Sequence, residues 1–133
     1  MFMDHIVLNA DDEYLLMDFY MNVIGLEPDR LDLYRQGEVP FPSVRINADT
    51  IIDIFPKKMW AQNSAQAKGR PNLNHYCIGF SHDQWEALRG RLEKAGVEIF
   101  RGPEDVWGAH GQGISIFFHD PEDNIVEAKY YVE

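Results

Sequence analysis

The chain lacks several features, and each absence excludes a class of protein. Cys77 is the only cysteine among 133 residues, so neither an intrachain disulfide nor a zinc–thiolate cluster can form. Basic residues are scarce: 12 Lys and Arg stand against 22 Asp and Glu, and the net charge of −10 opposes binding to nucleic acid and to anionic lipid surfaces. Long apolar runs are also missing, which predicts that no segment spans a membrane.

What remains is the composition of a globular protein. Hydrophobic residues make up 45% of the chain, which is enough to build the core of one domain or of two small fused modules. The first residues are acidic where a signal peptide would be basic and then apolar, because they include Asp4, Asp11, Asp12 and Glu13. We therefore expect a cytoplasmic protein.

The first half of the chain predicts one helix among several strands. Residues 4–9 (DHIVLN) are prone to form a β-strand. A helix should follow, because Asp11 or Asp12 can accept hydrogen bonds from the first free amides and Gly25 suits the helix end. The apolar stripe of this helix is Leu15, Leu16, Phe19, Tyr20 and Val23. Three extended segments are expected next, at 31–35, 43–47 and 50–55.

The second half repeats this order after a polar segment. Residues 56–71 are polar and aperiodic, which indicates a linker or flap. A strand is expected at 74–80 and then a helix that ends at Gly96, with its apolar stripe formed by Trp85, Leu88 and Leu92. Later strands are expected at 97–100, before a break at 101–103, and on both sides of the Asp120-Pro121 turn, with a glycine-containing loop at 107–112.

The repeated order indicates an internal duplication, with module one at about 1–56, a linker at about 57–71 and module two at about 72–133. Each module begins with a histidine in its first strand, His5 or His75, and ends with a carboxylate in its last strand, Asp53 or Glu127. Two imidazoles with one or two carboxylates suit a divalent Zn, Ni, Fe, Mn or Co ion in an open site.

The motifs that carry this pattern resemble those of the vicinal oxygen chelate superfamily, which includes glyoxalases, bleomycin-resistance proteins and extradiol dioxygenases. They are DHIVLN, FYMNVIGLE, IIDIF, NHYCIGF, LEKAGVEI, RGP and FHDPEDNIVEAKYY, and they cover nearly the whole chain. The resemblance implies an α+β fold in which two βαβββ modules form a cupped half-barrel of mixed sheet with flanking helices. It also implies a small-molecule substrate and a homodimer.

By position, the resemblance implies that His5, His75 and Glu127 are metal ligands. Asp53 matches the fourth ligand, although glyoxalase I has a longer glutamate there, so Asp53 could ligate directly, act through water or lie outside the ligand set. Glu127 is also the candidate base. His110, in a glycine-rich loop, is a candidate proton carrier because histidine titrates near neutral pH.

Three functions follow from these residues. The first is a metal-dependent isomerase, lyase or epimerase of the glyoxalase type, acting on a substrate with two neighbouring oxygens. The second is an extradiol-type dioxygenase that binds Fe(II) through His5, His75 and Glu127. The third is a non-catalytic protein that binds a small molecule, as in drug resistance.

Overall fold

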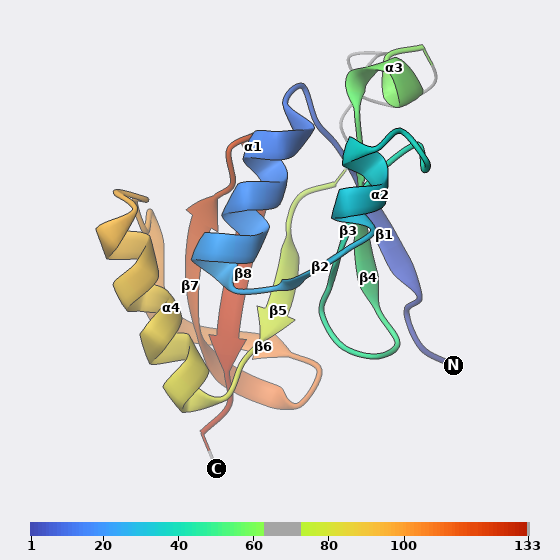
Figure 1. The fold of residues 1–133 in the computed structure, drawn as a ribbon. Coiled ribbons are helices and arrows are strands. Elements are labelled where there is room, and N and C mark those ends of the chain that lie inside the picture. Colours follow the sequence, from blue (N-terminus) through green and yellow to red (C-terminus); the bar gives the residue numbers. More distant parts are fainter. Residues whose placement is uncertain (63–72, 133) are drawn as a thin grey trace. The chain divides into compact units, whose positions relative to one another are not determined.

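A computed structural model of the chain describes residues 1–62 and 73–132. It divides into two compact units, Met1–Asn72 and Leu73–Glu133, which we call module one and module two (Figure 1). Each module contains one four-stranded mixed sheet with helices. The first strand lies parallel to the last strand in both sheets, and the remaining pairs are antiparallel. The duplicated α+β architecture predicted from the sequence is thus confirmed.

Module one has the sheet order β1-β4-β3-β2. Its strands are β1 (His5–Asn9), β2 (Glu27–Asp29), β3 (Ser43–Arg45) and β4 (Ile51–Phe55). Its helices are α1 (Glu13–Asp18), which continues into the π-helical segment η1 (Phe19–Ile24), α2 (Leu31–Arg35) and α3 (Lys57–Trp60).

The helix predicted in module one begins and ends as expected. Asp12 is the N-cap, since its Oδ1 accepts a hydrogen bond of 3.0 Å from the Leu15 amide. Gly25 ends η1 in the left-handed conformation at φ 94°. Leu15 itself was wrongly assigned to the buried stripe, because it is 53% exposed. The buried face is formed instead by Leu16, Met17, Phe19, Tyr20 and Ile24.

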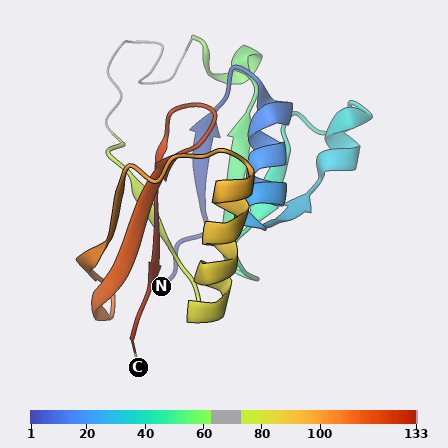
Figure 2. The same cartoon turned by 90° about the vertical axis from the view of Figure 1, so that its left-hand side faces the viewer.

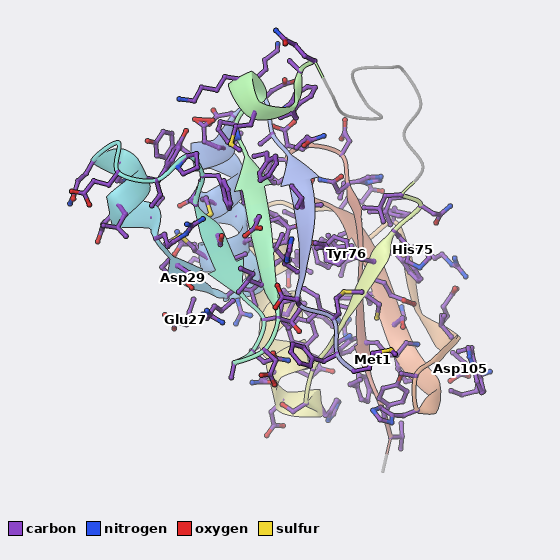
Figure 3. The ribbon with its side chains drawn as sticks, turned by 90° about the vertical axis from the view of Figure 1, so that its right-hand side faces the viewer. Met1, Glu27, Asp29, His75, Tyr76 and Asp105 are labelled. Atoms are coloured by element: carbon purple, nitrogen blue, oxygen red, sulfur yellow. The ribbon has the colours of Figure 1, made fainter. Side chains whose placement is uncertain are left out.

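The strand predicted at 31–35 is wrong, because these residues form α2. Only Leu31 in this segment is buried, and Asp32 and Arg35 pair one helical turn apart at 3.4 Å. The strand lies just before it, as β2, at the edge of the sheet (Figure 3). An edge strand accommodates Pro28, which lacks the amide hydrogen that a central strand would need.

Module two has the sheet order β5-β8-β7-β6, which repeats the order of module one. Its strands are β5 (Tyr76–Gly79), β6 (Arg101–Gly108), β7 (Gly111–His119) and β8 (Ile125–Tyr130), and its helix is α4 (His82–Lys94).

Helix α4 covers one face of the module-two sheet (Figure 2). It begins with a capping box, in which Ser81 and Gln84 each accept a hydrogen bond from the other's backbone amide. Its buried stripe contains Trp85, as predicted, whose indole N–H donates to the Ala128 carbonyl at 2.9 Å. The other predicted members, Leu88 and Leu92, are also buried. Because side chains alternate along β8, Glu127 lies on the opposite face of the sheet from α4.

The strand predicted at 97–100 is also wrong, since β6 begins only at Arg101 and includes the expected break at 101–103. The register between β6 and β7 shifts between Arg101 and Glu104, and β6 is an edge strand, so Pro103 is tolerated there. The loop expected at 107–112 consists mostly of strand ends, with Gly108 opposite Gly111.

The predicted turn before β8 is present. Asp120 Oδ1 accepts hydrogen bonds from the amides of Glu122 at 2.9 Å and Asn124 at 3.0 Å, and Asp123 adopts φ 62°. The expected link at 56–71 begins with α3, and its part from residue 63 onward lies outside the described residues. No helix within the described part of the chain is long and apolar enough to cross a membrane.

Candidate metal centre

Module one brings His5 and Asp53 together. His5 begins β1 and Asp53 lies in β4, two strands that are parallel neighbours. The His5 Nε2 atom is 4.0 Å from Asp53 Oδ2, and Asp53 is buried at 7% exposure. The other carboxylate oxygen, Oδ1, accepts a hydrogen bond of 2.6 Å from the hydroxyl of Ser43, its cross-strand partner in β3. One oxygen of Asp53 is therefore held by Ser43, and the other faces His5.

Module two brings His75 and Glu127 together in the same way. The sequence predicted His75 inside a strand, whereas it lies one residue before β5, next to Tyr76 (Figure 3). Its Nε2 atom is 3.9 Å from Glu127 Oε2. Glu127 is only 3% exposed, and its Oε1 atom has no hydrogen-bond partner among the described residues.

Both imidazoles are held through the nitrogen that points away from the carboxylate. Nδ1 of His5 donates to Asp4 Oδ2 at 2.7 Å, and Nδ1 of His75 donates to Asn74 Oδ1 at 2.6 Å. Each acceptor is the residue directly before the histidine. With the proton on Nδ1, the lone pair of Nε2 is free to bind a metal ion, and the neighbouring oxygen fixes the orientation of the ring.

The hydrogen bond to Asp4 also affects proton binding by His5. It raises the pKa of His5 above the ordinary value of 6.5, and the nearby Asp53 carboxylate adds to the effect. Because a metal ion binds only neutral imidazole, protons compete with a metal ion for His5 as the pH falls toward and below this pKa.

A buried lysine lies beside Glu127, whereas none lies beside Asp53 among the described residues. Lys129 is 2% exposed, its Nζ atom lies 4.0 Å from Glu127 Oε1, and it donates a hydrogen bond to the Val106 carbonyl. The sequence analysis missed Lys129, together with Ser43 in module one. Strand alternation placed Lys129 on the face of Glu127, and that position was the signal that could have found it.

Cys77 is the neighbour of Glu127 on the other side, in β5. Desolvation of its sulfur, followed in size by the hydrogen bond to Glu127, raises the pKa of Cys77 to about 12. The thiol therefore stays protonated at neutral pH, which disfavours it as a metal ligand or a nucleophile.

His110, the candidate proton carrier, contacts Tyr131. It is exposed in the turn between β6 and β7, where its amide donates to the Tyr131 hydroxyl at 3.2 Å. Its ring packs edge-on against the Tyr131 ring, with centroids 5.2 Å apart. The structure thus brings the metal-ligand candidates together as two pairs, and among the described residues no group of three or more His, Cys, Asp or Glu side chains is gathered as a metal site.

The sequence and the fold match a known superfamily. The profile of the Glyoxalase/Bleomycin resistance protein/Dioxygenase superfamily matches residues 2–128. The chain therefore belongs to this superfamily, as its motifs predicted.

Individual relatives are more distant. The virulence protein STM3117 of Salmonella typhimurium is 27% identical over 97% of this chain and 83% of its own length. Its crystal structure matches this fold with a TM-score of 0.74 at 23% identity, covering 99% of this chain and 98% of that one. Lactoylglutathione lyase from Agrobacterium tumefaciens has a TM-score of 0.66 at 19% identity, covering 98% and 92% of the two chains. The fosfomycin resistance protein FosX from Listeria monocytogenes, solved with Mn(II) and dihydroxypropylphosphonic acid, has a TM-score of 0.66 at 20% identity, covering 96% and 90%.

Proposed function

We propose that the protein is a metal-dependent enzyme of the glyoxalase type that acts on a small molecule with two neighbouring oxygens. The observation that carries this proposal is the repeated pair: in each module an imidazole Nε2 faces a buried carboxylate oxygen, at 4.0 Å for His5 and Asp53 and at 3.9 Å for His75 and Glu127. We propose that one module-one pair and one module-two pair bind the same metal ion.

The residues fit a divalent metal ion by three criteria. Metal–ligand bonds of about 2.0–2.2 Å allow two donor atoms on one ion to lie up to about 4 Å apart, and both pairs meet this limit. The donor set of nitrogen and oxygen suits Zn, Ni, Fe, Mn or Co. The Nδ1 hydrogen bonds to Asp4 and Asn74 supply the outer support that ligating histidines usually have.

Glu127 is the best candidate for moving a proton. When bound, the ion would polarise a substrate oxygen and so make the neighbouring C–H more acidic. Glu127 Oε1 has no hydrogen-bond partner among the described residues, so it can accept a proton, whereas Asp53 Oδ1 already accepts from Ser43. His110 is the candidate that exchanges this proton with solvent, because it is exposed in a turn.

A second candidate function is an Fe(II)-dependent extradiol-type dioxygenase. The hydrogen bond from Ser43 commits one oxygen of Asp53, which favours a set of two histidines and one carboxylate, namely His5, His75 and Glu127. That set is typical of non-haem Fe(II) oxygenases. Two assays separate these functions. Oxygen uptake by the Fe(II)-loaded protein in the presence of catechol would indicate the dioxygenase, and proton exchange at the carbon of a hydroxy-ketone would indicate the glyoxalase-type enzyme.

Metal analysis tests the ligand set. We expect about one ion per chain in the wild type, and a loss of metal affinity of at least about 100-fold in His5→Ala, His75→Ala and Glu127→Ala. Glu86→Ala is the matched control, because Glu86 also faces a histidine, His82, at 3.6 Å but on the surface of α4. Full metal content in His5→Ala and Glu127→Ala would overturn the site. A wild type that takes up no divalent metal would instead support a non-catalytic binding protein.

Mixing variants tests how the pairs combine. If the protein is a homodimer that shares its sites, His5→Ala and His75→Ala chains together would recover metal binding that each lacks alone, because some sites would receive two intact pairs. If each chain builds its own site, the mixture would bind no more metal than the separate variants.

A further inference from the structure

Three polar side chains on one face of the module-two sheet are buried with hydrogen-bonding capacity left over. Ser115 is 0%, Glu127 3% and Lys129 2% exposed. Ser115 is the cross-strand partner of Lys129, so their side chains project on the same face, which is also that of Glu127. Among the described residues, neither Ser115 Oγ nor Glu127 Oε1 has a hydrogen-bond partner. Buried polar atoms are nearly always paired, so two unpaired atoms on one face of the sheet call for an explanation.

Lys129 is held firmly but is only partly satisfied. Its ammonium donates to the Val106 carbonyl, while its distance of 4.0 Å to Glu127 Oε1 is too long for a hydrogen bond. An ammonium carries three N–H donors. The side chain passes close to two glycines: a Cβ atom on Gly108 would lie 2.9 Å from Lys129 Cε, and one on Gly113 would lie 3.1 Å from Cγ. This packing fixes the ammonium next to the carboxylate.

There is also room beside this cluster. Gly79 in β5 is the registered neighbour of Lys129 on β8, so a side chain at position 79 would project on the same face. A Cβ atom at this position would meet no atom of residues 1–62 and 73–132 within 4 Å. Open space for a ligand therefore lies on this face of β5, beside the first atoms of the Lys129 side chain.

We infer that Ser115, Glu127 and Lys129 bind one hydroxyl group of the substrate. The hydroxyl oxygen accepts hydrogen bonds from the Lys129 ammonium and the Ser115 hydroxyl, and its O–H donates a hydrogen bond to Glu127 Oε1. The charges of Lys129 and Glu127 cancel, which favours a neutral hydroxyl. An anionic oxygen would be repelled by Glu127, and a cationic nitrogen would be repelled by Lys129.

This inference deepens the proposed function and rests on it for the substrate class. Glu127 presents Oε2 to His75 and Oε1 to Lys129, so a ligand oxygen at the cluster and another at the metal would be close neighbours. A small hydroxy-ketone or hydroxy-aldehyde carries its oxygens in that relation, with the carbonyl oxygen for the ion and the hydroxyl for the cluster.

Titration of the metal-free protein with hydroxyacetone tests the cluster, with acetone as the matched probe that lacks the hydroxyl. We expect hydroxyacetone to cause saturable shifts of the backbone amide resonances of Ser115, Glu127 and Lys129, and acetone to cause none. Ser115→Ala should weaken hydroxyacetone binding about tenfold, the effect of one lost hydrogen bond. Gly79→Val should abolish it by filling the open space without removing a polar group.

Gly90→Val is the control for the glycine substitution, because Gly90 lies in α4 and a Cβ atom there also meets nothing within 4 Å in the part of the chain that the structure describes. It should bind hydroxyacetone like the wild type, and dispersed amide spectra of all variants confirm folding. Equal binding of acetone, or wild-type affinity in both Ser115→Ala and Gly79→Val, would overturn the inference. So would a crystal structure, soaked in hydroxyacetone, in which the cluster holds an ordered water only. Because the titration uses metal-free protein, its failure is distinct from a failure of metal binding.

Discussion

The two modules have the same sheet order and the same histidine–carboxylate pair, but they hold the carboxylate differently. In module one the cross-strand partner of Asp53 is Ser43, which donates a hydrogen bond to it. In module two the partner of Glu127 is Phe117, which donates none. A duplicated backbone therefore fixes where the pair lies, while the side chains around it decide how each carboxylate can react.

The contrast continues two residues further along the last strand. In module one that position is Phe55, whose ring contacts the Phe41 ring at a centroid distance of 4.8 Å. In module two it is Lys129, which lies opposite Ser115. The residue two positions after Asp53 is thus apolar, and the Asp53 carboxylate is partly satisfied by Ser43. The neighbourhood of Glu127 is cationic and retains unused hydrogen-bonding groups, which is why we place proton transfer and substrate recognition in module two.

The largest expected effect on stability comes from Lys129→Met, which shortens the unbranched side chain by one atom and removes its charge. Glu127 would then be buried without a cation, and we expect the free energy of unfolding to fall by about 3 kcal/mol. Ser43→Ala removes a hydrogen bond to Asp53 and should cost about 1–2 kcal/mol. Chemical denaturation of both variants measures the difference. Equal losses would show that the two carboxylates are held equally, against the contrast drawn above.

The loss of metal affinity should also be larger when the carboxylate of module two is changed than when that of module one is changed. Glu127→Gln removes a charged ligand without changing its size, and we expect a loss of at least about 100-fold in affinity, against about tenfold for Asp53→Asn. Competition with a chromophoric chelator measures both. A larger loss in Asp53→Asn would make Asp53 the principal carboxylate and would contradict the three-ligand set of the dioxygenase alternative.

The stability of the folded protein should depend on pH through His5, the first residue of β1 in module one. The pKa of His5 is raised by Asp4, so this interaction stabilises the folded state below the unfolded pKa near 6.5 and is lost as the pH rises through the folded pKa. In metal-free protein, Asp4→Asn should lower the pKa of His5 in NMR titrations. Its destabilisation relative to wild type should be present at pH 5.5 and absent at pH 9.

Asp49→Asn is the matched control, because it removes the same charge from module one at a turn residue whose backbone amide donates to Asn47. It should leave the His5 titration where it is in the wild type. If Asp4→Asn and Asp49→Asn moved the pKa equally, the shift would come from general surface charge and not from the hydrogen bond.

The smallest effect is expected in α4, the helix of module two. Gly90 is inside this helix and has open space around a Cβ atom, so Gly90→Ala should raise the free energy of unfolding by about 1 kcal/mol through helix propensity. Thermal unfolding measures this gain. No gain would mean that α4 is not limiting for the stability of module two.

The sequence predicted much of the fold because the strongest periodic patterns carried it. The stripe of Trp85, Leu88 and Leu92, the Asp120 turn and the repeated strands are local signals, and the structure contains them. It failed at 31–35 and at 97–100, where short alternating segments resemble strands and only tertiary packing decides. Pro103 was read as a break because an edge strand with a bulge cannot be recognised from the sequence.

The candidate site was predicted less completely than the fold. Strand position and duplication led to His5, His75, Asp53 and Glu127, and the structure pairs them within each module. Lys129 was overlooked although strand alternation puts it on the face of Glu127. Ser43 and Ser115 were not found, because their positions beside Asp53 and Lys129 depend on cross-strand neighbours that only the register reveals. His110 contacts Tyr131, and its role as a proton carrier stays a prediction.

X-ray absorption spectroscopy of the metal-loaded protein tests the central claim most directly, because it counts the imidazoles bound to the ion. We predict two imidazoles in the wild type, one from His5 and one from His75, and a single imidazole in any ion that His5→Ala or His75→Ala still binds at high metal concentration. A wild-type spectrum with one imidazole or none, or a spectrum that neither substitution changes, would contradict the proposal that the two modules share one ion.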